Sequence, residues 1–144
     1  MGRAKRAYNV GMWKSAESVA LAFVQAINRH DVEILGELMA PRHRFIDSMG
    51  QVVEGRENAR VAWGGYFRMV PDYSISVEEI FSKGPVVVMV GMAKGTYTKD
   101  GWLREENGWK TESAFRATIK DEKVAEWRVY ADNEPMRQRI KASV

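Results

Sequence analysis

The hydrophobic repeat of this chain changes at Pro71, from the period of a helix to the period of a strand. Before Pro71, apolar residues recur every three or four positions, as in Val19, Phe23 and Ile27. After it, apolar and polar residues alternate, as in residues 73–78. A chain whose helices mostly precede a run of antiparallel strands is expected to adopt an α+β fold, with the apolar faces of sheet and helices buried against each other.

The breaks in these patterns predict where the elements begin and end. Ser15 and Asp31 are suitable N-caps, because their side chains can accept hydrogen bonds from the first backbone N–H groups of a helix. Pro41 and Pro71 are expected to stop the second and third helices. The pattern predicts helices over residues 15–29, 31–40 and 55–70, strands over 43–50, 51–53, 73–78, 86–97, 111–119 and 124–131, and a short helix or an irregular tail over 134–140.

Length and composition favour one globular domain without a covalent cross-link. The chain has 144 residues, 45% of them apolar, and no cysteine. The missing cysteine excludes a disulfide scaffold, a thiolate zinc site and a cysteine nucleophile. No apolar run reaches the ~18 residues that a membrane-spanning helix requires, so we expect no membrane partner. We predict a single domain over residues 15–135, flanked by basic tails over 1–14 and 136–144.

The net charge of +3 comes from the two ends of the chain. Residues 1–14 carry four basic side chains and no acidic one, whereas residues 15–132 carry 15 basic and 18 acidic side chains. A nucleic-acid-binding face would gather Lys and Arg within the folded part, so we expect solvated tails and no nucleic-acid partner. No apolar stretch follows the first basic residues, which argues against a secretion signal and favours a cytoplasmic protein.

Several short segments resemble the nuclear transport factor 2-like superfamily, in particular its SnoaL-like polyketide cyclases and ketosteroid isomerases. The resemblance covers about residues 15–135 and is carried by AFVQAIN at 22–28, HD at 30–31, LMAP at 38–41, GR at 55–56 and KVAEWRVYAD at 123–132. It implies a cystatin-like, cone-shaped barrel: a curved, mixed but mainly antiparallel sheet wrapped around the N-terminal helices, with an internal pocket. It further implies a homodimer formed through the sheet and a reaction without a cofactor.

The ketosteroid isomerases give the sharpest comparison for catalysis. Their general base is an Asp at the end of the first strand, and Asp47 stands at the matching position. His43 and Phe45 are expected on the same side of that strand as Asp47, and His43 could assist proton transfer. The two oxyanion donors of these isomerases are missing, because Phe23 and Ser113 occupy the corresponding positions. We therefore do not expect dienolate chemistry on a steroid.

The limonene epoxide hydrolases, another branch of the superfamily, fit less well. Their last strand carries Trp-Arg-Asp, whereas Trp127-Arg128 is followed here by Val129. The strand at 86–97, where that branch places an Arg and an Asp, has Lys94 as its one charged residue.

The resemblance and the aromatic content together suggest the walls of the pocket. The expected ligand-binding residues are Phe23, Phe45, Trp63, Tyr66, Trp109, Ser113 and Trp127. Strand alternation puts Asp132 on the opposite, outer face from Trp127, although some members of the superfamily that the chain resembles place an acidic residue near this position in their site. Two histidines without an acid at helical spacing are a weak metal signal, so no metal is expected.

Two functions remain open at this point. The first is an isomerase, cyclase or lyase that acts on a small apolar carbonyl compound, with Asp47 as general base. The second is a module of the same fold that binds a ligand or another chain without catalysis. A cavity below ~300 Å³, or one that Asp47 does not face, would favour partner binding.

Overall fold

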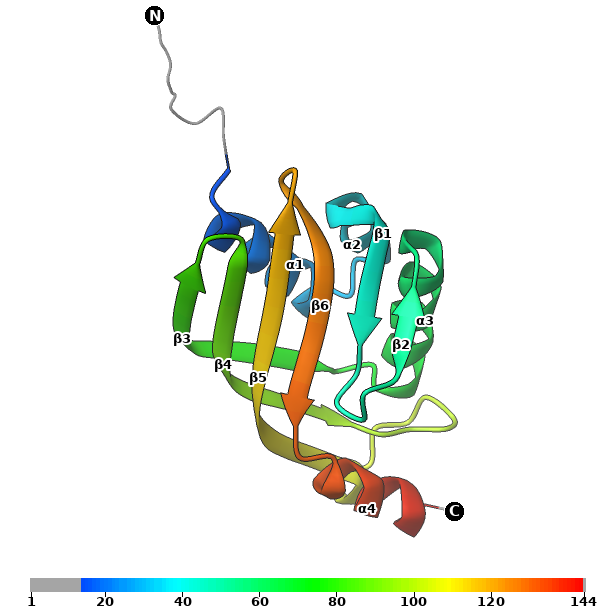
Figure 1. The fold of residues 1–144 in the computed structure, drawn as a ribbon. Helices are drawn as coiled ribbons and strands as arrows, with labels where there is room; N and C mark the ends of the chain where they lie inside the picture. Colours follow the sequence, from blue (N-terminus) through cyan, green and yellow to red (C-terminus); the bar gives the residue numbers. More distant parts are fainter. Residues whose placement is uncertain (1–13, 144) are drawn as a thin grey trace, which may run out of the picture.

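The computed structural model describes residues 14–143, which form an α+β fold with a curved sheet around the N-terminal helices (Figure 1). The predicted tail at 1–14 lies outside the described residues apart from Lys14. The helices are α1 (Ala16–Asn28), α2 (Val32–Leu38), α3 (Arg56–Met69) and α4 (Glu134–Ala142), with a 3-10 turn, η2 (Glu105–Asn107). The strands are β1 (Met39–Ile46), β2 (Val52–Glu54), β3 (Ser74–Lys83), β4 (Val86–Thr96), β5 (Gly108–Lys120) and β6 (Lys123–Ala131).

The helix starts follow the predicted caps. The Ser15 hydroxyl accepts a hydrogen bond from the N–H of Ser18 at 3.1 Å, and Asp31 Oδ1 accepts one from Ile34 at 3.0 Å. The prediction that Pro41 ends the second helix is wrong. That helix ends at Leu38, and Pro41 is an exposed residue of β1. The strand begins early because its first residue, Met39, already pairs with β6.

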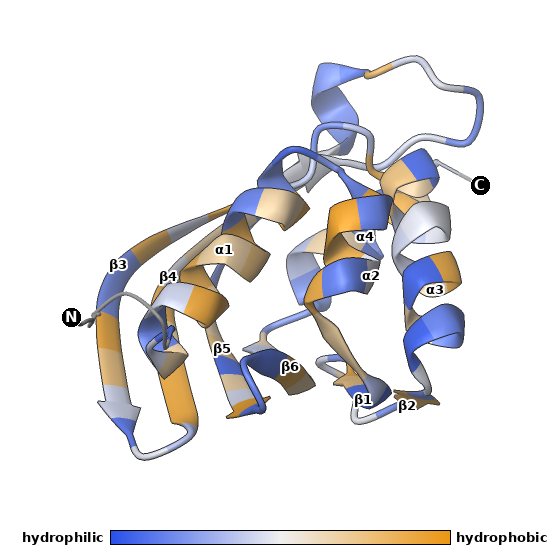
Figure 2. Cartoon of the chain, turned by 90° about the horizontal axis from the view of Figure 1, so that it is seen from above, coloured by the Kyte–Doolittle hydropathy of each residue, from blue (hydrophilic) through white to orange (hydrophobic). Residues whose placement is uncertain are grey.

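The strands form one mixed sheet in the order β2-β1-β6-β5-β4-β3. The pairs β1–β2, β3–β4, β4–β5 and β5–β6 are antiparallel, while β1 and β6 run parallel. Figure 2 shows α1, α2 and α3 on the same side of this sheet, inside its curve. The fold class expected from the sequence is thus confirmed. For the C-terminal residues, helix rather than irregular tail is the observed structure.

A bulge between β3 and β4 contributes to the bend of the sheet. The register shifts between Val77 and Glu79, next to Gly91 of β4. A Cβ atom at Gly91 would lie 2.8 Å from the carbonyl carbon of Ser76 and closer still to its oxygen. The two backbones therefore approach each other more closely than any residue except glycine allows, as is common at strand bulges.

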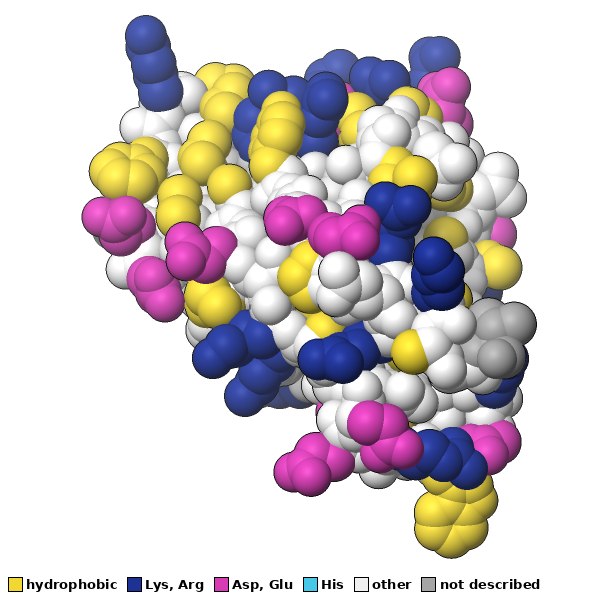
Figure 3. Space-filling view, turned by 90° about the horizontal axis from the view of Figure 1, so that it is seen from below, with side chains coloured by type: hydrophobic (Ala, Val, Ile, Leu, Met, Phe, Trp, Pro, Cys, Tyr) yellow, Lys and Arg dark blue, Asp and Glu magenta, His cyan; other side chains and the backbone are white. Residues whose placement is uncertain are grey.

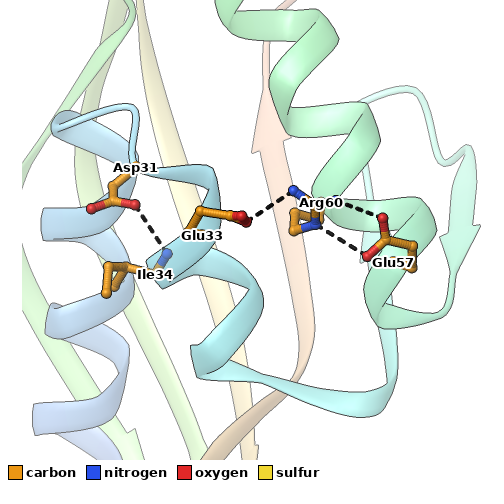
Figure 4. A network of polar contacts seen from close by, with 5 residues as sticks. All are labelled: Asp31, Glu33, Ile34, Glu57 and Arg60. Atoms are coloured by element: carbon orange, nitrogen blue, oxygen red, sulfur yellow. Dashed lines mark hydrogen bonds and ion pairs between the residues drawn. The ribbon is translucent and has the colours of Figure 1, made fainter.

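Arg60 joins α2 to α3 through a three-residue ion network (Figure 4). Its guanidinium lies 3.1 Å from Glu33 of α2 and 2.6 Å from Glu57 of α3. The Arg60 side chain passes over Gly36, where a Cβ would come within 3.0 Å of its Cδ. Because these ion pairs are exposed, their contribution to stability is small, and their structural effect is to hold α3 against α2.

The inside of the curve is filled by a continuous hydrophobic core contributed by the helices and the sheet. Its largest side chains with no measurable exposure are Trp127, Phe23, Ile27 and Leu35. No helix within residues 14–143 has the length and apolar character needed to cross a membrane.

Candidate functional site

A cavity of about 50 Å³ lies at the end of the cone next to α4, the helix that lies below the strands in Figure 1. Side chains from α3, the sheet, the β1–β2 turn and α4 meet there. The lining residues are Ser48, Tyr66, Tyr73, Ala93, Trp109, Thr111, Ser113, Val129, Ala131, Asp132, Asn133 and Met136. One wall of this cavity is aromatic, and the residues at 48, 111, 113 and 132–133 add polar groups.

Three of the predicted pocket residues, Tyr66, Trp109 and Ser113, line the cavity. Tyr73 lies between the two aromatic ones. Its ring centroid is 4.9 Å from that of Tyr66, nearly perpendicular to it, and 6.1 Å from that of Trp109. Burial raises the pKa of both tyrosines, so that their phenols stay protonated. The Tyr66 hydroxyl donates to the sulfur of Met136, at 3.7 Å, which ties α4 to α3.

The other predicted wall residues lie deeper and pack against one another. The Trp127 ring is 4.8 Å from that of Phe23 and 5.7 Å from that of Phe115. Phe45 stacks on Trp63 at 5.0 Å. None of Phe23, Phe45, Trp63 and Trp127 is a lining residue of the cavity. These rings therefore occupy the space that an emptier cone would offer to a ligand.

His43 is fully buried in the same interior, with its ring 6.0 Å from that of Phe23. Its Nδ1 lies 2.7 Å from the carbonyl oxygen of Val124 and so donates the hydrogen bond. The other ring nitrogen has no hydrogen-bond partner among the described residues. Burial lowers the pKa of His43 more than its neighbours raise it, which keeps the imidazole neutral.

Asp47 follows the last residue of β1 and holds the turn to β2. Its Oδ1 accepts hydrogen bonds from the backbone N–H groups of Met49 and Gln51, both at 2.9 Å. Such contacts are typical of an Asp that stabilises a turn. Asp47 is not among the lining residues, although its neighbour Ser48 is. The structure thus separates Asp47 and His43 from the cavity.

Of the two placements left open for Asp132, the outer face given by strand alternation is wrong, because Asp132 is one of the cavity-lining residues. The strand β6 ends at Ala131, so alternation no longer fixes the direction of the next side chain. Asp132 is exposed at the rim, where its Oδ1 accepts from the N–H of Glu134 at 2.9 Å. Beside it, the Ser48 hydroxyl donates to Asn133 and so joins the β1–β2 turn to the start of α4.

The sequence interpretation missed Tyr73, Asn133 and Met136 as cavity residues. Tyr73 stands at the start of the alternating pattern after Pro71, which gives a signal for a strand but none for a pocket. Met136 reaches the cavity because α4 folds back. The sequence left open whether residues 134–140 form a helix or an irregular tail, and so it did not predict this position. Among residues 14–143, no three His, Cys, Asp or Glu side chains come together as a potential metal site.

Residues 20–127 match the family model described as a SnoaL-like domain. A comparison with curated proteins finds no match. Among solved structures, a candidate SnoaL-like polyketide cyclase from Jannaschia sp. is similar, with 22% identity and a TM-score of 0.76 over 92% of this chain and 99% of that one.

Two further structures show the same likeness. One is a candidate SnoaL-like polyketide cyclase from Shewanella denitrificans, with 17% identity and a TM-score of 0.76 over 88% of this chain and 97% of that one. The other is a candidate polyketide cyclase from Streptomyces antibioticus, with 20% identity and a TM-score of 0.73 over 89% and 99%. At these identities the likeness is one of fold.

Proposed function

Since three quarters of the chain match its model, the protein belongs to the SnoaL-like domain family, and we propose that it binds a very small molecule in the cavity at the open end of its cone. The observation that carries this proposal is the composition of the cavity wall. Tyr66, Tyr73 and Trp109 offer apolar surface, while Ser113 and Asp132 offer hydrogen-bonding groups at defined positions. Convergent polar groups in a mostly apolar concavity are characteristic of ligand sites.

The size of the cavity limits the ligand. An enclosed water needs about 10–15 Å³ of space for its centre, so a cavity of about 50 Å³ has room for roughly three to five non-hydrogen atoms. Pockets for drug-sized ligands measure about 300–1,000 Å³. A steroid or a polycyclic polyketide therefore does not fit inside, and a larger ligand would place one small group there and extend past Asp132.

Binding can be tested by filling the cavity from β5. Ser113 is buried in the wall, and Ser113→Leu is expected to remove binding of small fragments, as followed by NMR shifts of the Trp109 indole N–H. Thr118→Leu on the same strand is the matched control, because its side chain points to the other face. If fragments of three to five non-hydrogen atoms shift no cavity resonance in the unmodified protein, the proposed function is wrong.

Catalysis is the second candidate function, favoured by a carboxylate at the cavity. We propose that this function is proton abstraction next to the carbonyl of a small ketone, without a cofactor. The carbon-bound proton moves to a carboxylate, the electron pair moves into the enolate, and a proton returns to carbon. The sequence points to Asp47, with His43 assisting, as the base, whereas the cavity geometry favours Asp132.

Two variants distinguish these bases. NMR would follow the exchange of the ketone's α-proton for deuterium in heavy water. We expect Asp132→Asn to lower the exchange rate about 10²-fold or more and Asp47→Asn to leave it within twofold. The reverse result would identify Asp47 as the base. Equal rates for both variants and the unmodified protein would leave binding as the one supported function.

Partner binding is favoured by a cavity that is smaller than ~300 Å³ and that Asp47 does not line, and the outer face of the sheet offers a surface for a homodimer. Phe81 is 57% exposed and pairs with Val88, while Val86 and Val90 continue an apolar row along the outer face of β4. We propose that a second copy covers this row, since contiguous exposed apolar patches are characteristic of interaction sites. Light scattering should give a dimer for the unmodified protein and a monomer for Val88→Asp. Val61→Asp, at an exposed position of α3, should remain a dimer.

A further inference from the structure

The aromatic residues of the cavity form a partial box rather than a flat wall. The rings of Tyr66 and Tyr73 meet at 85°, and the Trp109 ring continues the wall from Tyr73 at an interplanar angle of 39°. Neighbouring ring centroids are 4.9 and 6.1 Å apart. A group of three to five non-hydrogen atoms held in this cavity would lie within the ~6 Å of a ring centroid over which an aromatic face attracts a cation.

The charge at the cavity has one sign. Asp132 is the one Asp, Glu, Lys, Arg or His among the lining residues. Basic and acidic side chains both occur on this end of the molecule (Figure 3), but the nearby arginines of α4 are engaged elsewhere. Arg139 donates to the carbonyl of Gly108, and Arg137 pairs with Glu134. Nothing among the described lining residues offers a positive charge to an anionic ligand.

The polar contacts of the rim leave part of the Asp132 carboxylate available. Its Oδ1 accepts the N–H of Glu134, which fixes the side chain at the start of α4. Its Oδ2 takes part in no hydrogen bond or ion pair with the described residues, and the side chain is exposed. Because Asp132 lines the cavity and its side chain is exposed, a cation held there gains a counter-charge without the cost of burying the carboxylate.

From the aromatic box, the single rim carboxylate and the volume, we propose that the cavity binds the methylated ammonium group of a small organic cation. This inference rests on the proposed function and specifies its ligand class. The methyl groups contact the rings of Tyr66, Tyr73 and Trp109, and the positive charge lies between these rings and Asp132. Such a group has about as many non-hydrogen atoms as the cavity holds, so the rest of the molecule extends through the mouth.

The test compares tetramethylammonium with tert-butanol, which has the same number of non-hydrogen atoms and no charge, and with the anion pivalate, which is two non-hydrogen atoms larger. Calorimetry gives the dissociation constants, and NMR gives the upfield shift that aromatic rings impose on methyl protons of a bound compound. We expect tetramethylammonium to bind at least about tenfold more tightly than tert-butanol and pivalate to bind more weakly than either. The methyl resonance of tetramethylammonium should shift upfield on binding.

Two variants localise the effect. Asp132→Asn is expected to weaken the binding of tetramethylammonium about threefold to tenfold, as expected for the loss of an exposed charge at the rim. The dissociation constant of tert-butanol should not change. Glu112→Gln removes one negative charge from the outer face of β5 and should change neither of the two dissociation constants. If tert-butanol binds as tightly as tetramethylammonium, or if Asp132→Asn does not weaken the cation, the ligand class is wrong while the binding function stands. If none of the three compounds shifts a cavity resonance, the ligand class fails, and the fragment test on Ser113 then decides the binding function.

Discussion

Replacing Gly91 with alanine is expected to lower the free energy of unfolding by about 3 kcal/mol or more. The added methyl group would overlap the carbonyl of Ser76, and a backbone carbonyl in a sheet cannot rotate away as a side chain can. The strand pair must then separate or change register at the bulge, which exceeds the ordinary cost of overpacking a core. For a chain of this length the melting temperature should fall by about 6–12 °C, measurable by circular dichroism.

Gly64→Ala is the matched control, because it is the same substitution and is expected to change the free energy of unfolding in the opposite direction. Gly64 lies inside α3, and a Cβ there would meet its nearest neighbours at 3.8 and 4.0 Å, which is ordinary contact. Alanine should therefore raise stability by up to about 1 kcal/mol through its better helix propensity. A Gly91→Ala protein as stable as the unmodified one would show that the β3–β4 approach is not as close as described.

The second large effect is a loss of stability in mild acid, caused by His43. Its folded-state pKa is lowered from the ordinary value of 6.5, chiefly by burial. Between pH 6.5 and the lower folded-state pKa, the unfolded chain therefore binds a proton that the native protein does not. Stability is fully present above pH 6.5 and falls as the pH drops through this window, by at most about 1.4 kcal/mol per pH unit.

Denaturant unfolding at a series of pH values between 7 and 5 would measure this slope, above the range in which exposed carboxylates titrate. His43→Asn removes the titrating ring and places an amide N–H near the position of Nδ1, so the slope should largely disappear. His30→Asn is the control. His30 has a φ of 55°, which asparagine tolerates, and the pH dependence of stability should persist in this variant. An unchanged slope in His43→Asn would contradict a neutral, buried His43.

Most of the fold was predictable because its signals are local. The two predicted caps, the proline after α3 and the two-residue alternation each act within a few residues, and each corresponds to an observed element. The errors arise where distant segments decide. Met39 belongs to a strand because Val124, far along the chain, pairs with it. The bulge at Gly91 likewise depends on the partner strand, and a glycine in a strand does not reveal it.

The site was less predictable, because a pocket is the space that packing leaves. Tyr66, Trp109 and Ser113, which the sequence suggested as pocket residues, line the cavity. Trp63 and Trp127 carry the same sequence signal, yet their rings fill the interior against Phe45 and Phe23. No pattern distinguishes an indole that lines a cavity from one that fills it. Strand alternation could not place Asp132, since the alternation ends where β6 ends.

The position of β6 between β1 and β5 affects how the protein folds during translation. The edge of β1 that pairs with β6 stays unpaired until residue 131, the last residue of β6, has left the ribosome. The sheet can therefore close only after β6 has been made, and until then β1 exposes unpaired backbone to other nascent chains. We expect ribosome-bound chains that end before β6 to depend on chaperones and to become protease-resistant only once that strand emerges.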